Sequence, residues 1–171
     1  FVIAFCLGSL LGVIRTLPNK PLAAIGNLYV EIFRNIPLIV QLFFWAFVFP
    51  EFLPQSLSAG SGELVAGGWW KNLLNQNPAS IGVMALGLYT AARVSEQIRA
   101  GILTVPRGQK FAASALGFTT AQSYRYVILP VAYRIVWPTI TPESMNIFKN
   151  SAVLYALSVL NFFAYTKTMR E

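Results

Sequence analysis

Charged side chains interrupt apolar stretches of this sequence at spacings that suit a helix. Glu31 lies three residues before Arg34, and Glu96 lies three residues before Arg99. Residues three apart share one face of a helix, so each spacing predicts a structural ion pair. Arg93 lies three residues before Glu96 and admits two interpretations. Its planar guanidinium matches a carboxylate, which could belong either to Glu96 or to a bound ligand.

A second group of polar side chains follows residue 142. Glu143 could bind the ammonium group of a ligand, or it could form an ion pair with a neighbouring subunit. Ser144 and Asn146 add polar groups to the same region. Lys149 lies six residues beyond Glu143, so the two side chains point in different directions on a helix and we interpret Lys149 as structural. Arg93, Glu143 and Asn146 are therefore the candidate ligand-binding residues.

The residue types needed for catalysis and metal binding are nearly absent. The sequence contains no His and no Asp, and it has one Cys. Most catalytic triads and metal sites cannot be assembled without these residues, so we predict no catalytic residue and no metal ligand. The sequence also lacks a Walker-type phosphate loop, so any hydrolysis of ATP would belong to a partner protein.

The composition indicates an integral membrane protein. Only 11% of the 171 residues are charged, whereas soluble domains carry about 25%, and 56% are hydrophobic. This length allows one helical domain of four or five spans of about 20 residues each. The net charge of +7 comes from scattered basic residues, which indicates a topology signal and not a nucleic-acid partner.

The predicted elements that position the charged residues are helices. We expect the second half of a span over residues 1–14, and one long helix over 22–49 that bends near Pro37. A further helix is expected from Ala79 to about Thr104, and a final span over 139–163 that follows a segment along the membrane edge. Basic residues gather near the segments assigned to the cytoplasm, which places the connection 51–78 outside the cell.

The polar stretch 108–130 interrupts these apolar segments. Its Ala-rich first part predicts a short helix over 109–116, and Gly117 can adopt the left-handed conformation that ends it. A second short helix is expected over 119–127, and Pro130 is expected to end it. The small side chains of Ala112, Ala113 and Gly117 would allow another protein to approach the backbone closely.

This stretch resembles the cytoplasmic EAA loop of ABC-importer permeases. The resemblance rests on Ala112-Ala113, Gly117 and the segment Val-Ile-Leu-Pro at 127–130, which are spaced as in that loop. Phe111 stands where the family carries Glu, and Val127 stands where it carries Ile. Residues 28–44, 88–117 and 126–154 resemble permease subunits of polar amino-acid ABC importers, and the similarity is closest to the glutamate/aspartate type.

The resemblance implies an all-α membrane protein, a multi-span helical bundle of the ABC type I importer permease fold with a cytoplasmic coupling helix. It implies one transmembrane permease domain over residues 1–171, truncated at both ends, in the bacterial inner membrane. Contacts with the ATPase would come from the loop 108–130. The residues that the resemblance assigns to this coupling are Gln109, Ala112, Ala113, Gly117, Leu129 and Pro130. Arg93 occupies a position that is often aromatic in relatives for other amino acids, which favours acidic substrates.

The implied partners are a second permease subunit, identical or homologous, a cytoplasmic ABC ATPase dimer, and a periplasmic or lipid-anchored substrate-binding protein. ATP and magnesium would be bound by the ATPase, and this chain would bind no cofactor and no nucleic acid. The function implied is ATP-driven import of glutamate and aspartate. Three alternatives remain open: a permease for another polar amino acid, a non-transport signalling or assembly component, and an ion-coupled carrier. The last is disfavoured because no paired inverted repeats are evident.

Overall fold

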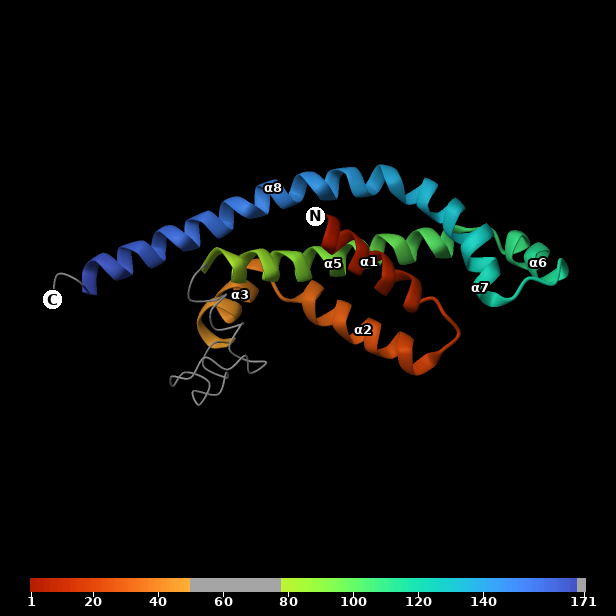
Figure 1. The fold of residues 1–171 in the computed structure, drawn as a ribbon, viewed down its shortest axis with the longest axis horizontal. Coiled ribbons are helices and arrows are strands. Elements are labelled where there is room, and N and C mark those ends of the chain that lie inside the picture. The colour runs from red at the N-terminus through yellow and green to blue at the C-terminus, as the bar shows by residue number, and fades with distance from the viewer. Residues whose placement is uncertain (50–77, 169–171) are drawn as a thin grey trace, which may run out of the picture. The chain divides into compact units, whose positions relative to one another are not determined.

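The computed structural model describes residues 1–49 and 78–168, and every regular element in these ranges is a helix (Figure 1). This confirms the predicted all-α class. In chain order the elements are α1 (Val2–Ile14), α2 (Lys20–Asn35), α3 (Leu38–Phe43), the π-helix η1 (Phe44–Val48), α5 (Pro78–Thr104), α6 (Arg107–Ala115), α7 (Thr120–Ser123), the π-helix η4 (Tyr124–Ile128) and α8 (Leu129–Thr168).

The chain forms two compact units. The first unit comprises Phe1–Asn35 and Leu88–Ile147, and the second comprises Ile36–Gly87 and Phe148–Glu171. The charged residues singled out in the sequence, from Glu31 to Glu143, all belong to the first unit.

The core of the first unit is an apolar seam between α5 and the segment formed by η4 and the start of α8. Each side contributes residues at intervals of three or four, which places them on one helical face. The buried members are Val94, Ile98, Ile102 and Val105 on one side, and Ile128, Ala132, Val136 and Ile140 on the other. Gly101 lies at this seam, where an added Cβ would meet the side chain of Val136. The seam therefore fixes α5 and α8 side by side.

The helix α1 packs closely on α5 through small residues. Ala4, Gly8 and Gly12 recur every four residues and are all buried. A Cβ at Gly8 would lie 2.6 Å from the carbonyl oxygen of Ala91, and one at Gly12 would lie 2.8 Å from Cβ of Ile98. Small residues at this spacing allow two helix backbones to approach each other, as in membrane helix pairs.

The second unit has a smaller described core. Leu42 of α3 and Ala85 of α5 are buried together, and Leu38 and Trp45 pack against them.

The predicted single helix over 22–49 is wrong, because the chain breaks at Pro37. Pro37 has φ −55° and ψ 141°, an extended conformation, and it caps the start of α3. Proline disfavours the helical conformation in the preceding residue, so α2 ends at Asn35 instead of bending. In contrast, the helix expected from Ala79 to Thr104 is confirmed by α5.

The loop between α5 and α8 has the two short helices that the sequence predicts. At the end of α6 the N–H of Phe118 donates to the carbonyl of Ala113, and that of Gly117 donates to Ser114. These two bonds and the φ of +77° at Gly117 form a Schellman motif. Thr119 and Gln122 then form a capping box at the start of α7.

The prediction that Pro130 ends a helix is wrong. The π-helix η4 runs directly into α8, and Pro130 lies in the first turn of α8. A proline leaves the carbonyl four residues earlier without its usual α-helical partner. For Pro130 that residue is Tyr126, which lies in the wider π turn. The irregularity is thus absorbed within the helix.

The predicted boundary between residues 138 and 139 is also absent. The helix α8 continues from Leu129 to Thr168 with Pro138 and Pro142 inside it. Hydroxyl groups near these prolines donate to backbone carbonyls, from Thr139 to Val136 at 2.8 Å and from Thr141 to Trp137 at 3.2 Å. These hydroxyl groups bond within the turns that contain the prolines, but the carbonyls that the prolines leave without an α-helical donor are those of Arg134 and Pro138.

Across the ranges that the structure describes, no helix is both long enough and apolar enough to cross a membrane. The predicted outer connection 51–78 lies outside the described residues, except for Pro78.

Candidate functional site

Arg93 and Glu143 form a two-pronged ion pair between α5 and α8. Nε of Arg93 lies 2.7 Å from Oε1 of Glu143, and Nη2 lies 3.1 Å from Oε2. The side chain of Glu143 is 4% exposed and that of Arg93 is 39% exposed. Two parallel bonds to one carboxylate are among the strong contacts of a guanidinium and fix the orientation of the pair. The exposed fraction of Arg93 leaves the arginine side of the pair open to solvent.

Two further residues of α5 surround this pair. Tyr89 lies one turn before Arg93, with its hydroxyl 3.5 Å from Nη1 and its ring centroid 5.9 Å from the guanidinium carbon. Gln97 lies one turn after Arg93 and donates from Nε2 to Oε2 of Glu143 at 3.4 Å. The buried Oε1 atom of Gln97 has no hydrogen-bond partner. Sequence reasoning missed both residues, although their spacing of four on each side of Arg93 was the available signal.

The structure gives Arg93 and Glu143 a partner that neither sequence interpretation named. Arg93 was expected to face a ligand or Glu96, and Glu143 was expected to face a ligand or a neighbouring subunit. In the structure the two contact each other, across a separation of fifty residues. Asn146, the third candidate, lies one turn beyond Glu143 on α8 and is partly buried.

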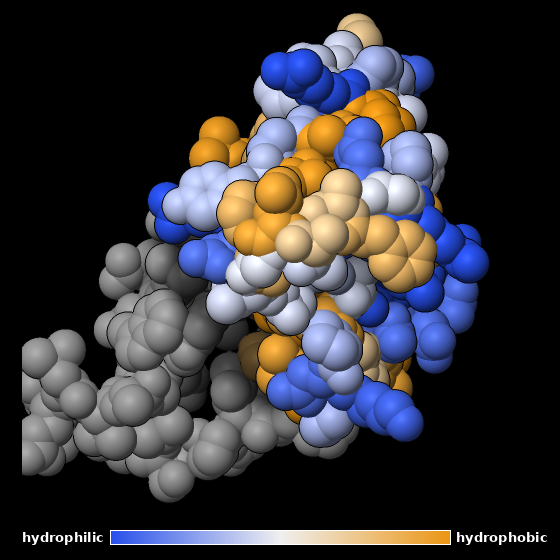
Figure 2. All heavy atoms as spheres, turned by 90° about the vertical axis from the view of Figure 1, so that its right-hand side faces the viewer, coloured by the Kyte–Doolittle hydropathy of each residue, from blue (hydrophilic) through white to orange (hydrophobic). Residues whose placement is uncertain are grey.

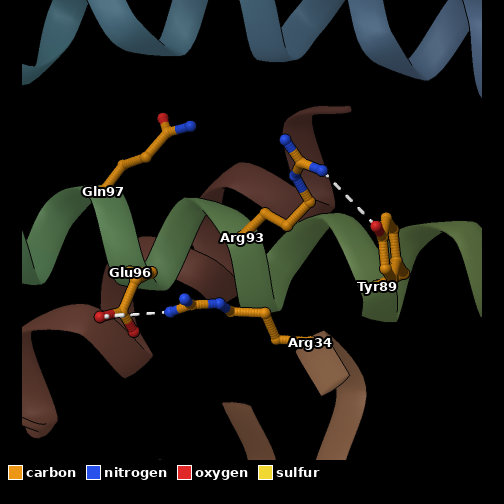
Figure 3. Close-up of a pocket in the computed structure, with 5 residues that line it drawn as sticks. All are labelled: Arg34, Tyr89, Arg93, Glu96 and Gln97. Atoms are coloured by element: carbon orange, nitrogen blue, oxygen red, sulfur yellow. Dashed lines mark hydrogen bonds and ion pairs between the residues drawn. The ribbon is translucent and has the colours of Figure 1, made fainter. Parts of the chain in front are cut away.

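Glu96 lies on a different side of α5 from Arg93, as Figure 3 shows. Its carboxylate faces guanidinium groups from the end of α1, from α2 and from α5 itself. The distances are 2.8 Å to Nη1 of Arg15, 3.6 Å to Nη1 of Arg34, and 3.7 Å to Nη1 of Arg99. The expected spacing of Glu96 and Arg99 is thus realised as an ion pair. The expected pair of Glu31 and Arg34 is wrong, because Arg34 faces Glu96 while Glu31 is exposed.

Arg15 is the most enclosed member of this group, with a side chain 5% exposed. Its Nε donates to the side-chain oxygen of Asn27 at 2.7 Å, and its Nη1 approaches Ser95 at 3.3 Å. Arg15 therefore joins the end of α1 to α2 and α5. In the sequence Arg15 counts only among the basic residues that indicate topology, because nothing near it in the sequence marks a partner.

A hollow of about 390 Å³ lies along α5 beside these charges. Its lining residues come from α2 and α5, and they are Arg34, Tyr89, Arg93, Glu96 and Gln97 (Figure 3). The charge around the hollow is unbalanced. Arg15, Arg34, Arg93 and Arg99 supply four guanidinium groups against the two carboxylates of Glu96 and Glu143, an excess of two positive charges.

The six predicted coupling residues do not share one surface. Ala112, Gly117 and Pro130 are exposed, and nothing lies within 4 Å of a Cβ built on Gly117. Ala113 is only 2% exposed, and Leu129 packs against the core of the first unit. Gln109 is partly buried, and its Oε1 atom has no hydrogen-bond partner. The close approach expected at Ala113 is therefore wrong, because this residue fixes α6 to its own unit.

Comparison with known proteins gives a consistent result. A family model described as "Binding-protein-dependent transport system inner membrane component" matches residues 4–165. The chain is 48% identical to the glutamate/aspartate import permease protein GltJ of Escherichia coli (strain K12), over 96% of this chain and 64% of that protein. It is 36% identical to the probable glutamine ABC transporter permease protein GlnM of Bacillus subtilis (strain 168), over 92% of this chain and 64% of that protein.

A solved structure agrees with this similarity. The crystal structure of an amino acid ABC transporter with histidines superposes with a TM-score of 0.64 and 29% identity, covering 91% of this chain and 65% of that chain. The chain spans less than two-thirds of the length of these relatives. The family model covers nearly all of the chain, so the chain belongs to the family of binding-protein-dependent transport system inner membrane components.

Proposed function

We propose that this chain is the permease portion of an ATP-driven, binding-protein-dependent importer of acidic amino acids. The observation that carries the proposal is the Arg93–Glu143 pair beside the hollow on α5. An α-amino acid bears a carboxylate and an ammonium group close together. It can therefore replace the pair, with its carboxylate on Arg93 and its ammonium on Glu143, so that the buried Glu143 and the half-buried Arg93 each keep an opposite charge.

The excess of positive charge favours acidic substrates within this class. When a substrate replaces the Arg93–Glu143 ion pair, it uses only the carboxylate and ammonium groups that every amino acid carries at its α-carbon. The remaining guanidinium groups of Arg15, Arg34 and Arg99 share one carboxylate, that of Glu96. A second carboxylate on the substrate is attracted to such a field, whereas a basic side chain is repelled. The name of the relative GltJ supports glutamate and aspartate, and that of GlnM points to the second candidate, a permease for glutamine.

The proposed mechanism is alternating access. A loaded substrate-binding protein delivers the amino acid at the outer side of the membrane, and closure of two partner ATPase subunits around ATP moves the loop between α5 and α8. The loop joins the two helices that carry Arg93 and Glu143, so its movement changes the geometry of their ion pair. A second permease subunit completes the pathway.

The experiment is uptake of labelled glutamate into proteoliposomes that contain the full-length protein, its partner permease and its ATPase, with the binding protein outside. We expect uptake that requires ATP and is suppressed by excess aspartate but not by glutamine or arginine. Suppression by glutamine equal to that by aspartate would support the glutamine permease instead. Uptake that persists without ATP and follows an ion gradient would contradict the ABC mechanism.

A further inference from the structure

The face of α6 presents one large apolar side chain among small neighbours. Phe111 is 71% exposed, although α6 is fixed to its own unit through the buried Ala113. The residues three and four positions away along the helix surround its side chain. They are Arg107, Gly108, Ser114 and Ala115, and all of them are exposed. A ring that projects from a shallow surface has room to enter a pocket on another protein.

This end of the first unit carries positive charge without any negative charge. The sequence contains no acidic residue between Glu96 and Glu143. Within that interval Arg107 and Arg125 are exposed and Lys110 is partly exposed. Figure 2 looks onto this end and shows apolar and strongly hydrophilic side chains side by side. A partner that matches this surface needs acidic groups around an apolar centre.

Further apolar side chains are exposed in the loop that follows Phe111. Leu116 is 75% exposed at the end of α6. Phe118 and Tyr126 place their ring centroids 6.4 Å apart, and the guanidinium carbon of Arg125 lies 5.9 Å from the ring centroid of Tyr126. The Schellman motif at Gly117 and the capping box at Thr119 hold the loop in this conformation. The surface is therefore preorganised, which lowers the entropic cost of binding.

We propose that Phe111 is the central anchor for the partner ATPase, and that the facing surface of the ATPase is an apolar pocket with an acidic rim. This inference rests on the proposed function and adds the chemistry of the contact. At the position of Phe111 the resembling permeases carry Glu, whose carboxylate favours a basic partner surface. An exposed phenyl ring favours an apolar partner surface instead. The residues Arg107, Lys110 and Arg125 then supply the charge complementarity at the rim.

A membrane surface is the competing partner for a basic and aromatic face, but the geometry of α6 favours a protein. A helix that lies on lipid presents a continuous apolar stripe. Among the nine residues of α6, the apolar side chains are Phe111 and three alanines. Leu116, Phe118 and Tyr126 are exposed in the loop and not on α6, so they do not extend Phe111 into a stripe along this helix. A single large side chain among small residues on a helix is typical of an anchor that fills a pocket on a protein.

The test measures the affinity of the assembled full-length permease for its ATPase in detergent, and again in nanodiscs with and without anionic lipid. The variants are Phe111→Leu, Phe111→Ala and Phe111→Glu. Thr104→Glu is the matched charge control, because Thr104 is exposed at the end of α5 and its hydroxyl bonds only to its own helix. Thermal unfolding of each variant verifies that the permease is intact.

We expect Phe111→Leu and Thr104→Glu to bind within a few-fold of the unmodified protein. Phe111→Ala is expected to weaken binding on the order of thirtyfold, as truncation of an interface anchor does, and Phe111→Glu is expected to weaken it further. Lys110→Glu is expected to slow association about tenfold at low salt, with a smaller effect at high salt.

Several results would overturn the inference. Equal or tighter binding of Phe111→Glu would show a basic pocket, and unchanged binding of Phe111→Ala would show that the ring is no anchor. Losses that appear only with anionic lipid would assign Phe111 to the membrane surface. If the unmodified permease bound no ATPase, the proposed function itself would fail. That outcome is distinct from the others, in which the unmodified protein binds.

Discussion

At the scale of single residues, the one carboxylate of Glu96 compensates the charge of three guanidinium groups. Its carboxylate faces Arg15, Arg34 and Arg99, and Arg15 is almost completely enclosed. An enclosed guanidinium must keep an opposite charge nearby, because removal of one partner from a buried ion pair leaves a charge without compensation. Glu96 therefore stabilises the junction of α1, α2 and α5.

We predict that Glu96→Gln destabilises the protein by about 2–3 kcal/mol. This lies somewhat below the loss of about 3–5 kcal/mol expected for a buried pair, because the side chain of Glu96 is one-third exposed. The measurement is the change in unfolding free energy in detergent. Glu31→Gln is the control, since Glu31 is exposed on α2, and it is expected to change stability by less than about 0.5 kcal/mol. Equal effects of the two substitutions would contradict this role of Glu96.

The sequence predicts ion pairs within one helix better than ion pairs between helices. Glu96 and Arg99 share a face of α5 by spacing alone, and the structure pairs them. The same rule failed for Glu31 and Arg34, because the packing of α2 against α5 brings Arg34 to a more enclosed carboxylate. The Arg93–Glu143 pair joins two helices, so no local spacing could reveal it.

At the scale of elements, the turn between α6 and α7 depends on one backbone conformation. Gly117 has a φ of +77°, and two hydrogen bonds of the Schellman motif flank it. Side chains other than glycine disfavour this region because Cβ approaches the following carbonyl. The turn between α6 and α7 therefore requires glycine at position 117.

We predict that Gly117→Ala lowers stability by about 1 kcal/mol or slightly more, although the space around the residue is open. Gly108→Ala is the matched control, because Gly108 lies inside α6, has no neighbour within 4 Å of a built Cβ and lacks a positive φ. It is expected to stabilise the helix by up to about 1 kcal/mol. Hydrogen exchange of the α6 and α7 amides measures both effects. Stabilisation by Gly117→Ala would contradict the role of the positive φ.

The sequence identified the helices and missed how proline acts in each of them. Gly117 and the Ala-rich segment before it marked the end of α6 correctly. Pro37 separates two helices, whereas Pro138 and Pro142 lie within one. The difference depends on how each helix packs with its neighbours, which a sequence window does not reveal.

At the scale of the whole molecule, α5 and α8 carry the Arg93–Glu143 ion pair and also flank the loop proposed to contact the ATPase. The helix α5 carries Arg93 and leads through two residues into α6. The helix α8 carries Glu143 and begins directly after η4. The apolar seam between α5 and α8 resists independent movement of either helix. A shift of the loop is therefore expected to reach the Arg93–Glu143 pair through packed helices.

The most direct test of the central claim uses the double variant Arg93→Gln/Glu143→Gln. The single variant Arg93→Gln removes the charged partner of the buried carboxylate of Glu143. We expect a loss of about 2–3 kcal/mol, below the figure of about 3–5 kcal/mol for a buried pair, because Arg93 is 39% exposed and Gln97 still donates to Glu143. The double variant removes both charges, so its stability is expected to recover. Stability in detergent and ATP-dependent glutamate uptake are measured on the same preparations.

If the pair binds the substrate, the double variant will be stable and will bind its ATPase, but its glutamate uptake will fall by about tenfold to a hundredfold. This corresponds to the loss of about 1.5–3 kcal/mol that accompanies one hydrogen bond to a charged group. If the pair is only structural, the double variant will transport glutamate at the rate of the unmodified protein. That result would contradict the assignment of Arg93 and Glu143 to the substrate.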